Sequence, residues 1–147
     1  IIGTPRGYFG AHFAGEGPPR VFALHPLALS GAVWCGAGAA GRMGLMGLDA
    51  RGHGASGWDG KPFTVEDMAD DAAAVIEATA SGPVGLIGLS MGGSTALVLA
   101  ARRPDLISRV VIADASAQLR TGSRRAVGGT SGVGGVQAAR AAARIPG

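Results

Sequence analysis

The chain has 147 residues, of which 47% are hydrophobic, so it can bury the core of one domain. No apolar run approaches the roughly 20 residues of a membrane-spanning helix. A single cysteine, Cys35, excludes an internal disulfide and a cysteine-cluster metal site. The net charge of +3 arises near the C-terminus, because residues 115–147 hold 5 arginines and no acid, while residues 1–114 hold 8 basic and 10 acidic residues. These arginines are spread out without aromatic neighbours, which disfavours binding to nucleic acid. Because the lone cysteine fits packing in a reducing compartment and no apolar run is long enough to span a bilayer, we expect a cytoplasmic protein that does not bind membranes.

The first part of the chain reads as short strands separated by loops. Tyr8–Ala14 alternates loosely between polar and apolar residues, which predicts a strand. Two short apolar runs are typical of buried strands, and each ends at a polar residue: Val21–Leu24 before His25, and Gly44–Leu48 before Asp49. A short helix within residues 30–41 and a loop at residues 51–57 complete this half.

A clear amphipathic helix begins at Thr64. Thr64 and Asp67 form a variant of the capping box, and apolar residues follow at helical spacing. The stretch Ser81-Gly82-Pro83 ends this helix. A later strand, Arg109–Ala113, precedes Asp114.

Strands that alternate with helices predict an α/β fold, with a mostly parallel sheet, right-handed crossovers and flanking helices. Ligands of such sheets bind at the carboxyl ends of the strands. Four residues that can take part in chemistry fall at these ends: His25, Asp49, Ser90 and Asp114.

The most informative stretch is Gly88-Leu-Ser-Met-Gly92, which matches the G-x-S-x-G pattern of a nucleophile elbow. The apolar run Pro83–Leu89 predicts a strand before it, and Ser94–Arg103 predicts a helix after it. A serine on a strained strand-to-helix turn projects its hydroxyl away from the backbone, and the residues two positions before and after it must be small. The pattern therefore predicts Ser90 as a nucleophile, with the Met91 N–H near a developing oxyanion.

Three blocks, in this order and spacing, resemble the N-terminal part of an enzyme of the α/β-hydrolase fold family. They are the strand and loop Val21–Leu27, the D-x-R-G-x-G-x-S loop at Asp49–Ser56, and the elbow at Gly88–Gly93. The resemblance covers roughly residues 8–116 and implies a truncated core of that fold. Within the family, small esterases and enol-lactone hydrolases are the most similar.

The resemblance also implies roles for individual residues. Ser90 would be the nucleophile, and the N–H groups of Leu27 and Met91 would form the oxyanion hole. His25 and His53 would organise loops. The implied enzyme needs no cofactor or metal and acts on a small-molecule ester or lactone through an acyl-enzyme.

The chain departs from the family in its catalytic base. The family places the acid and then the histidine after the nucleophile, whereas His12, His25 and His53 all precede Ser90. Asp114 could be the acid, although a strand-end aspartate that binds loop N–H groups is the better interpretation. We therefore expect a fragment of a longer enzyme.

The end of the chain differs in character from the rest. Residues 1–117 are expected to form the N-terminal part of the hydrolase domain. Residues 118–147 are a low-complexity tail of Gly, Ala and Arg that is expected to be poorly ordered and whose composition also fits a wrong-frame translation. A short Ala-rich helix could lie at Val136–Arg144. The strand Arg109–Ala113 is expected to lack its next neighbour and to leave an open edge, which a tail with few large apolar side chains covers poorly.

Two other functions remain as alternatives. The first is a catalytically inactive fragment or ligand-binding module on a hydrolase scaffold, which the missing histidine supports. The second is a nucleotide-binding protein, because Gly36–Gly41 matches G-x-G-x-x-G and Asp59 lies near the distance of a ribose-binding acid. The glycines that follow Gly41 disfavour the helix that this second motif requires.

Overall fold

The computed structural model describes residues 1–36, 43–115 and 142–144. The elements of these ranges, in chain order, are β1 (Ile2–Thr4), β2 (Gly7–Phe9), β3 (Ala11–Ala14), β4 (Val21–Leu24), α1 (Ala32–Cys35), β5 (Leu45–Leu48), α2 (Val65–Thr79), β6 (Val84–Leu89), α3 (Met91–Arg102), the 3₁₀ turn η1 (Pro104–Leu106), β7 (Ile107–Ala113) and β8 (Ala142–Arg144). None of the helices in these ranges has the length and apolar character needed to cross a bilayer.

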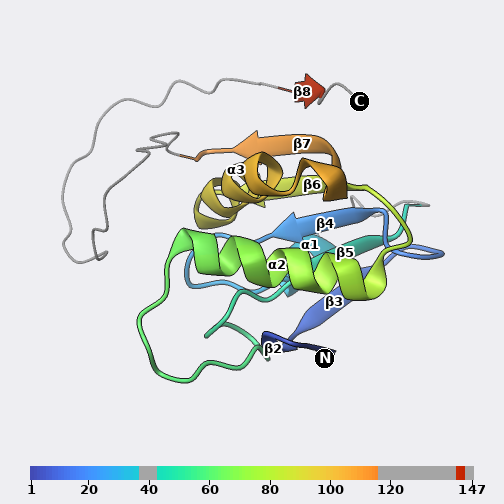
Figure 1. The fold of residues 1–147 in the computed structure, drawn as a ribbon. Helices are drawn as coiled ribbons and strands as arrows, with labels where there is room; N and C mark the ends of the chain where they lie inside the picture. Colours follow the sequence, from blue (N-terminus) through green and yellow to red (C-terminus); the bar gives the residue numbers. More distant parts are fainter. Residues whose placement is uncertain (37–42, 116–141, 145–147) are drawn as a thin grey trace.

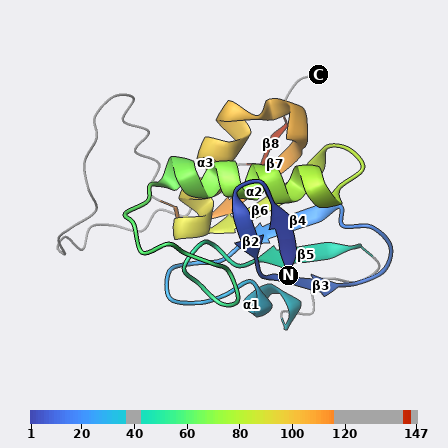
Figure 2. The same ribbon diagram turned by 60° about the horizontal axis from the view of Figure 1, so that its bottom comes forward.

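Within the described residues, six strands form one sheet in the order β3-β5-β4-β6-β7-β8 (Figure 1). Strands β5, β4, β6 and β7 are parallel, and the two outer strands, β3 and β8, run antiparallel to their neighbours. Helices α2 and α3 cover one face of the sheet and α1 lies on the other (Figure 2). The mostly parallel sheet with flanking helices confirms the predicted fold class.

The strand order reverses beside β4. From β4 the chain passes to β5 on one side and then returns to β6 on the other side. Parallel sheets open a crevice at such a reversal, outside the carboxyl ends of the strands. That crevice lies between the loop after Leu24 and the turn after Leu89. The sheet topology therefore points to the same two segments as the sequence motifs did.

Helix α2 packs its apolar side on the sheet. Of the apolar side chains at helical spacing, Ala69, Ala72, Val75 and Ile76 are buried in a core that includes Phe22, Leu86 and Leu99. Met68 is also buried, whereas Val65 is only half-buried. The capping box at its start is formed as predicted. The Thr64 hydroxyl accepts the Asp67 N–H at 3.2 Å, and the Asp67 carboxylate accepts the Thr64 N–H at 2.9 Å.

Replacing Thr64 with alanine is expected to lower the free energy of unfolding by about 1 kcal/mol, because the Asp67 N–H loses its acceptor. Thr64→Ser keeps the hydroxyl and is expected to retain most of that stability. Urea unfolding of both variants measures the difference. Equal stability of the alanine and serine variants would show that the cap does not stabilise α2.

Several elements differ from the sequence prediction. The segment Tyr8–Ala14 forms two strands that separate at Gly10, where a side chain would collide with the Asp49 carboxylate. The hairpin strand β1 was not predicted, and α3 begins at Met91 rather than at Ser94. Outer strands of this length carry too few residues to show a periodic pattern.

The prediction of a helix over Val136–Arg144 is wrong for the three residues of it that are described. Ala142–Arg144 is a strand that pairs antiparallel with β7, Arg144 opposite Arg109, so the edge of β7 is not open there. The remainder of the tail at residues 118–147, the domain boundary after residue 117 and all but the first residue of the Gly36–Gly41 motif lie outside the described residues.

Candidate active site

Ser90 forms the whole turn between β6 and α3. Its φ is 52° and its ψ is −114°, values that a residue with a side chain rarely adopts. Its N–H donates to the Ala113 carbonyl at 3.0 Å, and its own carbonyl accepts the Ser94 N–H at 3.0 Å. Its side chain makes no capping hydrogen bond to α3, so the hydroxyl is not used to hold the helix.

Two glycines leave room for this turn. A Cβ on Gly88 would collide with the Gly92 carbonyl, and a Cβ on Gly92 would collide with the Leu24 carbonyl and lie 2.8 Å from the His25 oxygen. The first turn of α3 therefore rests directly on the end of β4. These contacts confirm the expectation that the positions two before and two after Ser90 must be small.

His25 organises the loop after β4. Its ring is 1% exposed, with Nδ1 at 2.7 Å from the Pro26 carbonyl oxygen, and the Ala50 N–H donates to Nε2 at 3.0 Å. Both contacts are hydrogen bonds when the proton sits on Nδ1. Burial lowers the pKa of His25 below its ordinary value, which keeps the ring neutral and Nε2 able to accept.

The hydrogen bond to Pro26 also orients the next N–H. The peptide between Pro26 and Leu27 is trans, so its carbonyl and its N–H point in opposite directions. Because His25 holds the carbonyl, the Leu27 N–H points away from the buried ring. The Leu27 side chain is 68% exposed, so packing of this side chain does not fix the loop. The following residue, Ala28, has a φ of 64°.

Asp49 joins three segments at the end of β5. Its buried carboxylate accepts the Gly31 N–H at 2.7 Å on one oxygen and the Ala55 N–H at 2.8 Å on the other, and His12 Nε2 lies 3.1 Å away. Burial by itself would raise the pKa of Asp49, but the hydrogen bonds from Ala55, Gly31 and His12 together hold it below its ordinary value. The residue is therefore a charged structural centre for the loops around the crevice.

The sequence model of the alpha/beta hydrolase fold matches residues 19–144. The chain belongs to the α/β-hydrolase fold family. Lipase LipV of Mycobacterium tuberculosis is 34% identical over 110 residues, which are 74% of this chain and 41% of the lipase. The solved structure of the hypothetical protein PA1622 from Pseudomonas aeruginosa aligns with a TM-score of 0.71 at 28% identity, over 78% of this chain and 42% of that one.

A thermophilic esterase from Thermogutta terrifontis aligns with a TM-score of 0.65 at 27% identity, over 77% of this chain and 42% of the esterase. The relatives of this α/β-hydrolase chain thus include lipases and esterases. The chain spans less than half the length of the relatives named here.

In this α/β-hydrolase chain, each histidine is engaged by neighbours other than Ser90. Both ring nitrogens of His25 contact the backbone, and His12 contacts Asp49. His53 Nδ1 lies 3.0 Å from the Arg51 carbonyl oxygen, and its ring centroid is 5.1 Å from that of His25. These contacts agree with loop-organising roles for His25 and His53.

The remaining candidates lie around the elbow of this hydrolase fold. Met91 is the first residue of α3 and is half-buried. Asp114 is exposed, has a φ of 49° and follows the residue whose carbonyl accepts the Ser90 N–H. No group of three or more His, Cys, Asp or Glu side chains in the described ranges lies close enough together to hold a metal ion.

Sequence reasoning missed one buried charged residue next to this site, Asp71. It is 2% exposed and is contacted by Arg6 and Arg51. An acid within the otherwise apolar face of this helix was the available signal. The partners could not be chosen, because they are 65 and 20 residues away along the chain.

Proposed function

We propose that Ser90 is the nucleophile of a cofactor-free hydrolase that cleaves a carboxylic ester or lactone through an acyl-enzyme. The observation that carries the proposal is the turn at Ser90. This residue has a positive φ, and its hydroxyl does not cap the helix that follows. The turn also lies where the strand order of the sheet reverses. The lipase and esterase relatives support an ester as the substrate class.

In the proposed reaction, the Ser90 oxygen attacks the carbonyl carbon of the substrate while a base takes its proton. The carbonyl oxygen becomes an oxyanion that accepts the N–H groups of Leu27 and Met91. The Met91 N–H lies at the start of α3, where the helix dipole also favours negative charge. Collapse of the intermediate expels the protonated alcohol, and water then hydrolyses the acyl group from Ser90; with a lactone, the alcohol stays attached to the acyl group.

We further propose that the histidine base and the last part of the catalytic machinery lie outside these 147 residues, in a longer enzyme. Two observations support this. The three histidines of the chain all precede Ser90 and have the other partners described above. The chain also covers only 41% of the lipase it resembles.

A second candidate is a catalytically inactive or ligand-binding chain on the same scaffold. The position of all three histidines before Ser90 favours it. Assays of p-nitrophenyl acetate hydrolysis by the 147-residue chain and by the intact protein separate the two candidates. Activity in the intact protein supports the hydrolase, whereas an inactive intact protein that retains ligand binding supports the scaffold.

The test of Ser90 is labelling of the intact protein with a fluorophosphonate, which bonds to an activated serine oxygen and releases fluoride. We expect one adduct on the peptide that contains Ser90, and neither labelling nor p-nitrophenyl acetate hydrolysis above background in Ser90→Ala. Ser81→Ala, an exposed serine outside the site, is the matched control and is expected to keep both. Undiminished hydrolysis in Ser90→Ala, or an adduct only on another serine, would overturn the assignment.

A further inference from the structure

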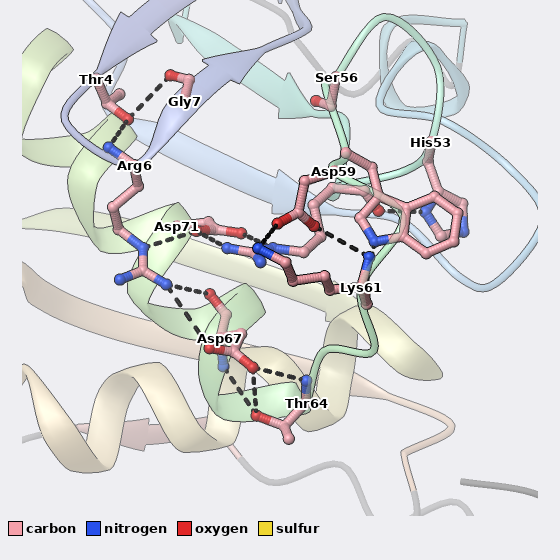
Figure 3. Close-up of polar contacts among 12 residues, drawn as sticks. Thr4, Arg6, Gly7, His53, Ser56, Asp59, Lys61, Thr64, Asp67 and Asp71 are labelled. Atoms are coloured by element: carbon pink, nitrogen blue, oxygen red, sulfur yellow. Dashed lines mark hydrogen bonds and ion pairs between the residues drawn. The ribbon is translucent and has the colours of Figure 1, made fainter. Parts of the chain in front are cut away.

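A buried ion-pair cluster lies beside the proposed oxyanion hole. The Asp71 side chain on α2 is 3% exposed. Arg51 donates to its carboxylate through Nε at 2.5 Å and Nη2 at 2.6 Å, and Arg6 donates through Nε at 2.7 Å. Figure 3 shows Arg6 reaching Asp71, with Asp67 and the Thr64 cap beside it. A buried carboxylate is stabilised by such partners, because they replace the hydrogen bonds that water would otherwise make.

Arg51 connects this cluster to the loop after β5. Its guanidinium lies 5.7 Å from the centroid of the Phe63 ring, so the ring and the Asp71 carboxylate both restrict it. Backbone groups on both sides of Arg51 contact histidines. The Ala50 N–H just before it donates to His25, and its own carbonyl oxygen contacts His53.

A small cavity brings the cluster and the start of α3 together. Its volume is about 20 Å³, and the residues that line it include His25, Arg51, Asp71, Met91 and Gly92. A space of this size holds about one water molecule. Because Arg51, Asp71 and His25 line the same small space, a displacement of Arg51 or Asp71 changes the surroundings of the His25 ring.

We propose that Asp71 is a positioning residue that sets the direction of the Leu27 N–H. Its effect passes through Arg51 to the Ala50 N–H, and from there to His25. When Arg51 is released, His25 loses its fixed donor, and the peptide that carries the Leu27 N–H loses its fixed direction. This inference rests on the proposed function, because it concerns the oxyanion hole of that reaction.

The charge of the cluster alone would have the opposite effect. Arg6 and Arg51 are balanced by Asp67 and Asp71, so the four side chains together are neutral. Asp71→Asn leaves a net positive charge near the hole, which by itself would stabilise an oxyanion. A lower turnover in this variant would therefore indicate lost geometry rather than a changed electric field.

The experiment compares Asp71→Asn with Asp70→Asn in the intact protein, at a temperature where circular dichroism shows both to be folded. We expect kcat of Asp71→Asn for p-nitrophenyl acetate to fall by about tenfold or more with KM within about twofold, because an oxyanion donor acts mainly in the transition state. Asp70 pairs with Arg102 at 3.2 Å, so its variant is expected to keep both constants. Arg51→Lys keeps the charge but loses the two-point contact, and it is expected to lower kcat as well.

Amide hydrogen exchange at Ala50, whose N–H donates to His25, gives a readout that does not depend on turnover. We expect exchange at this amide to speed up by about tenfold in Asp71→Asn and to stay unchanged in Asp70→Asn. An unchanged kcat, or a lowered kcat without faster exchange at Ala50, would overturn the positioning role. Undiminished hydrolysis by Ser90→Ala would instead overturn the proposed function, and the exchange rates would still decide whether Asp71 orders this loop.

Discussion

Replacing Gly92 with alanine is expected to lower the free energy of unfolding by about 3 kcal/mol. The added Cβ would collide with the Leu24 carbonyl and lie 2.8 Å from the His25 oxygen. These neighbours are backbone atoms at the end of a central strand, which cannot rotate away as a side chain can. Helix propensity acts in the other direction, since alanine inside a helix is favoured over glycine by about 1 kcal/mol.

Gly82→Ala is the matched control for this prediction, because no atom lies within 4 Å of the Cβ that it would add. Urea unfolding of both variants provides the measurement, with the control expected to be unchanged or slightly more stable. A Gly92→Ala variant as stable as Gly82→Ala would mean that α3 does not rest on β4 as closely as described.

Replacing Asp49 with asparagine is expected to cost about 3 kcal/mol of stability, although the side chains have the same shape. Each carboxylate oxygen accepts a backbone N–H, one from Gly31 and one from Ala55. An amide has one oxygen, so its NH₂ group must face one of these donors. Asp59→Asn, an exposed position in the loop before α2, is the control and is expected to change stability little.

The pH dependence of stability gives a second check on Asp49. The folded-state pKa lies below the unfolded value near 3.8. Its stabilising contribution is therefore fully present above that value and is lost as the pH falls toward the folded-state pKa. Acid unfolding curves should show a smaller pH dependence in this window for Asp49→Asn than for the unsubstituted chain, and identical curves would contradict the prediction.

The sequence predicted most completely the parts of the fold that local patterns control. The strand Val21–Leu24 has the same bounds in the structure, and the capping box at Thr64 is formed. The turn at Ser90 was predictable because the requirement for small neighbours acts within five consecutive residues. In each case the physical cause lies within a few positions of the residue concerned.

Contacts between distant segments could not be predicted in this way. The pairing of Asp71 with Arg6 joins residues 65 positions apart, and no periodic pattern records it. The split of the first long strand at Gly10 depends on the Asp49 carboxylate, which arrives from β5. The strand Ala142–Arg144 is defined by its pairing with β7 rather than by its own residues.

The non-glycine residues with a positive φ lie beyond the carboxyl ends of the parallel strands. In the described ranges, the non-glycine residues with this conformation are Ala28, Ser90 and Asp114, which follow β4, β6 and β7. Each such residue costs about 1–3 kcal/mol, and glycine would relieve that cost. Conformational stability alone would therefore favour glycine at Ser90, and a Ser90→Gly chain would fold more stably than the natural one. The stability of the fold therefore does not explain a hydroxyl at this strained position, whereas the nucleophilic role proposed for Ser90 would.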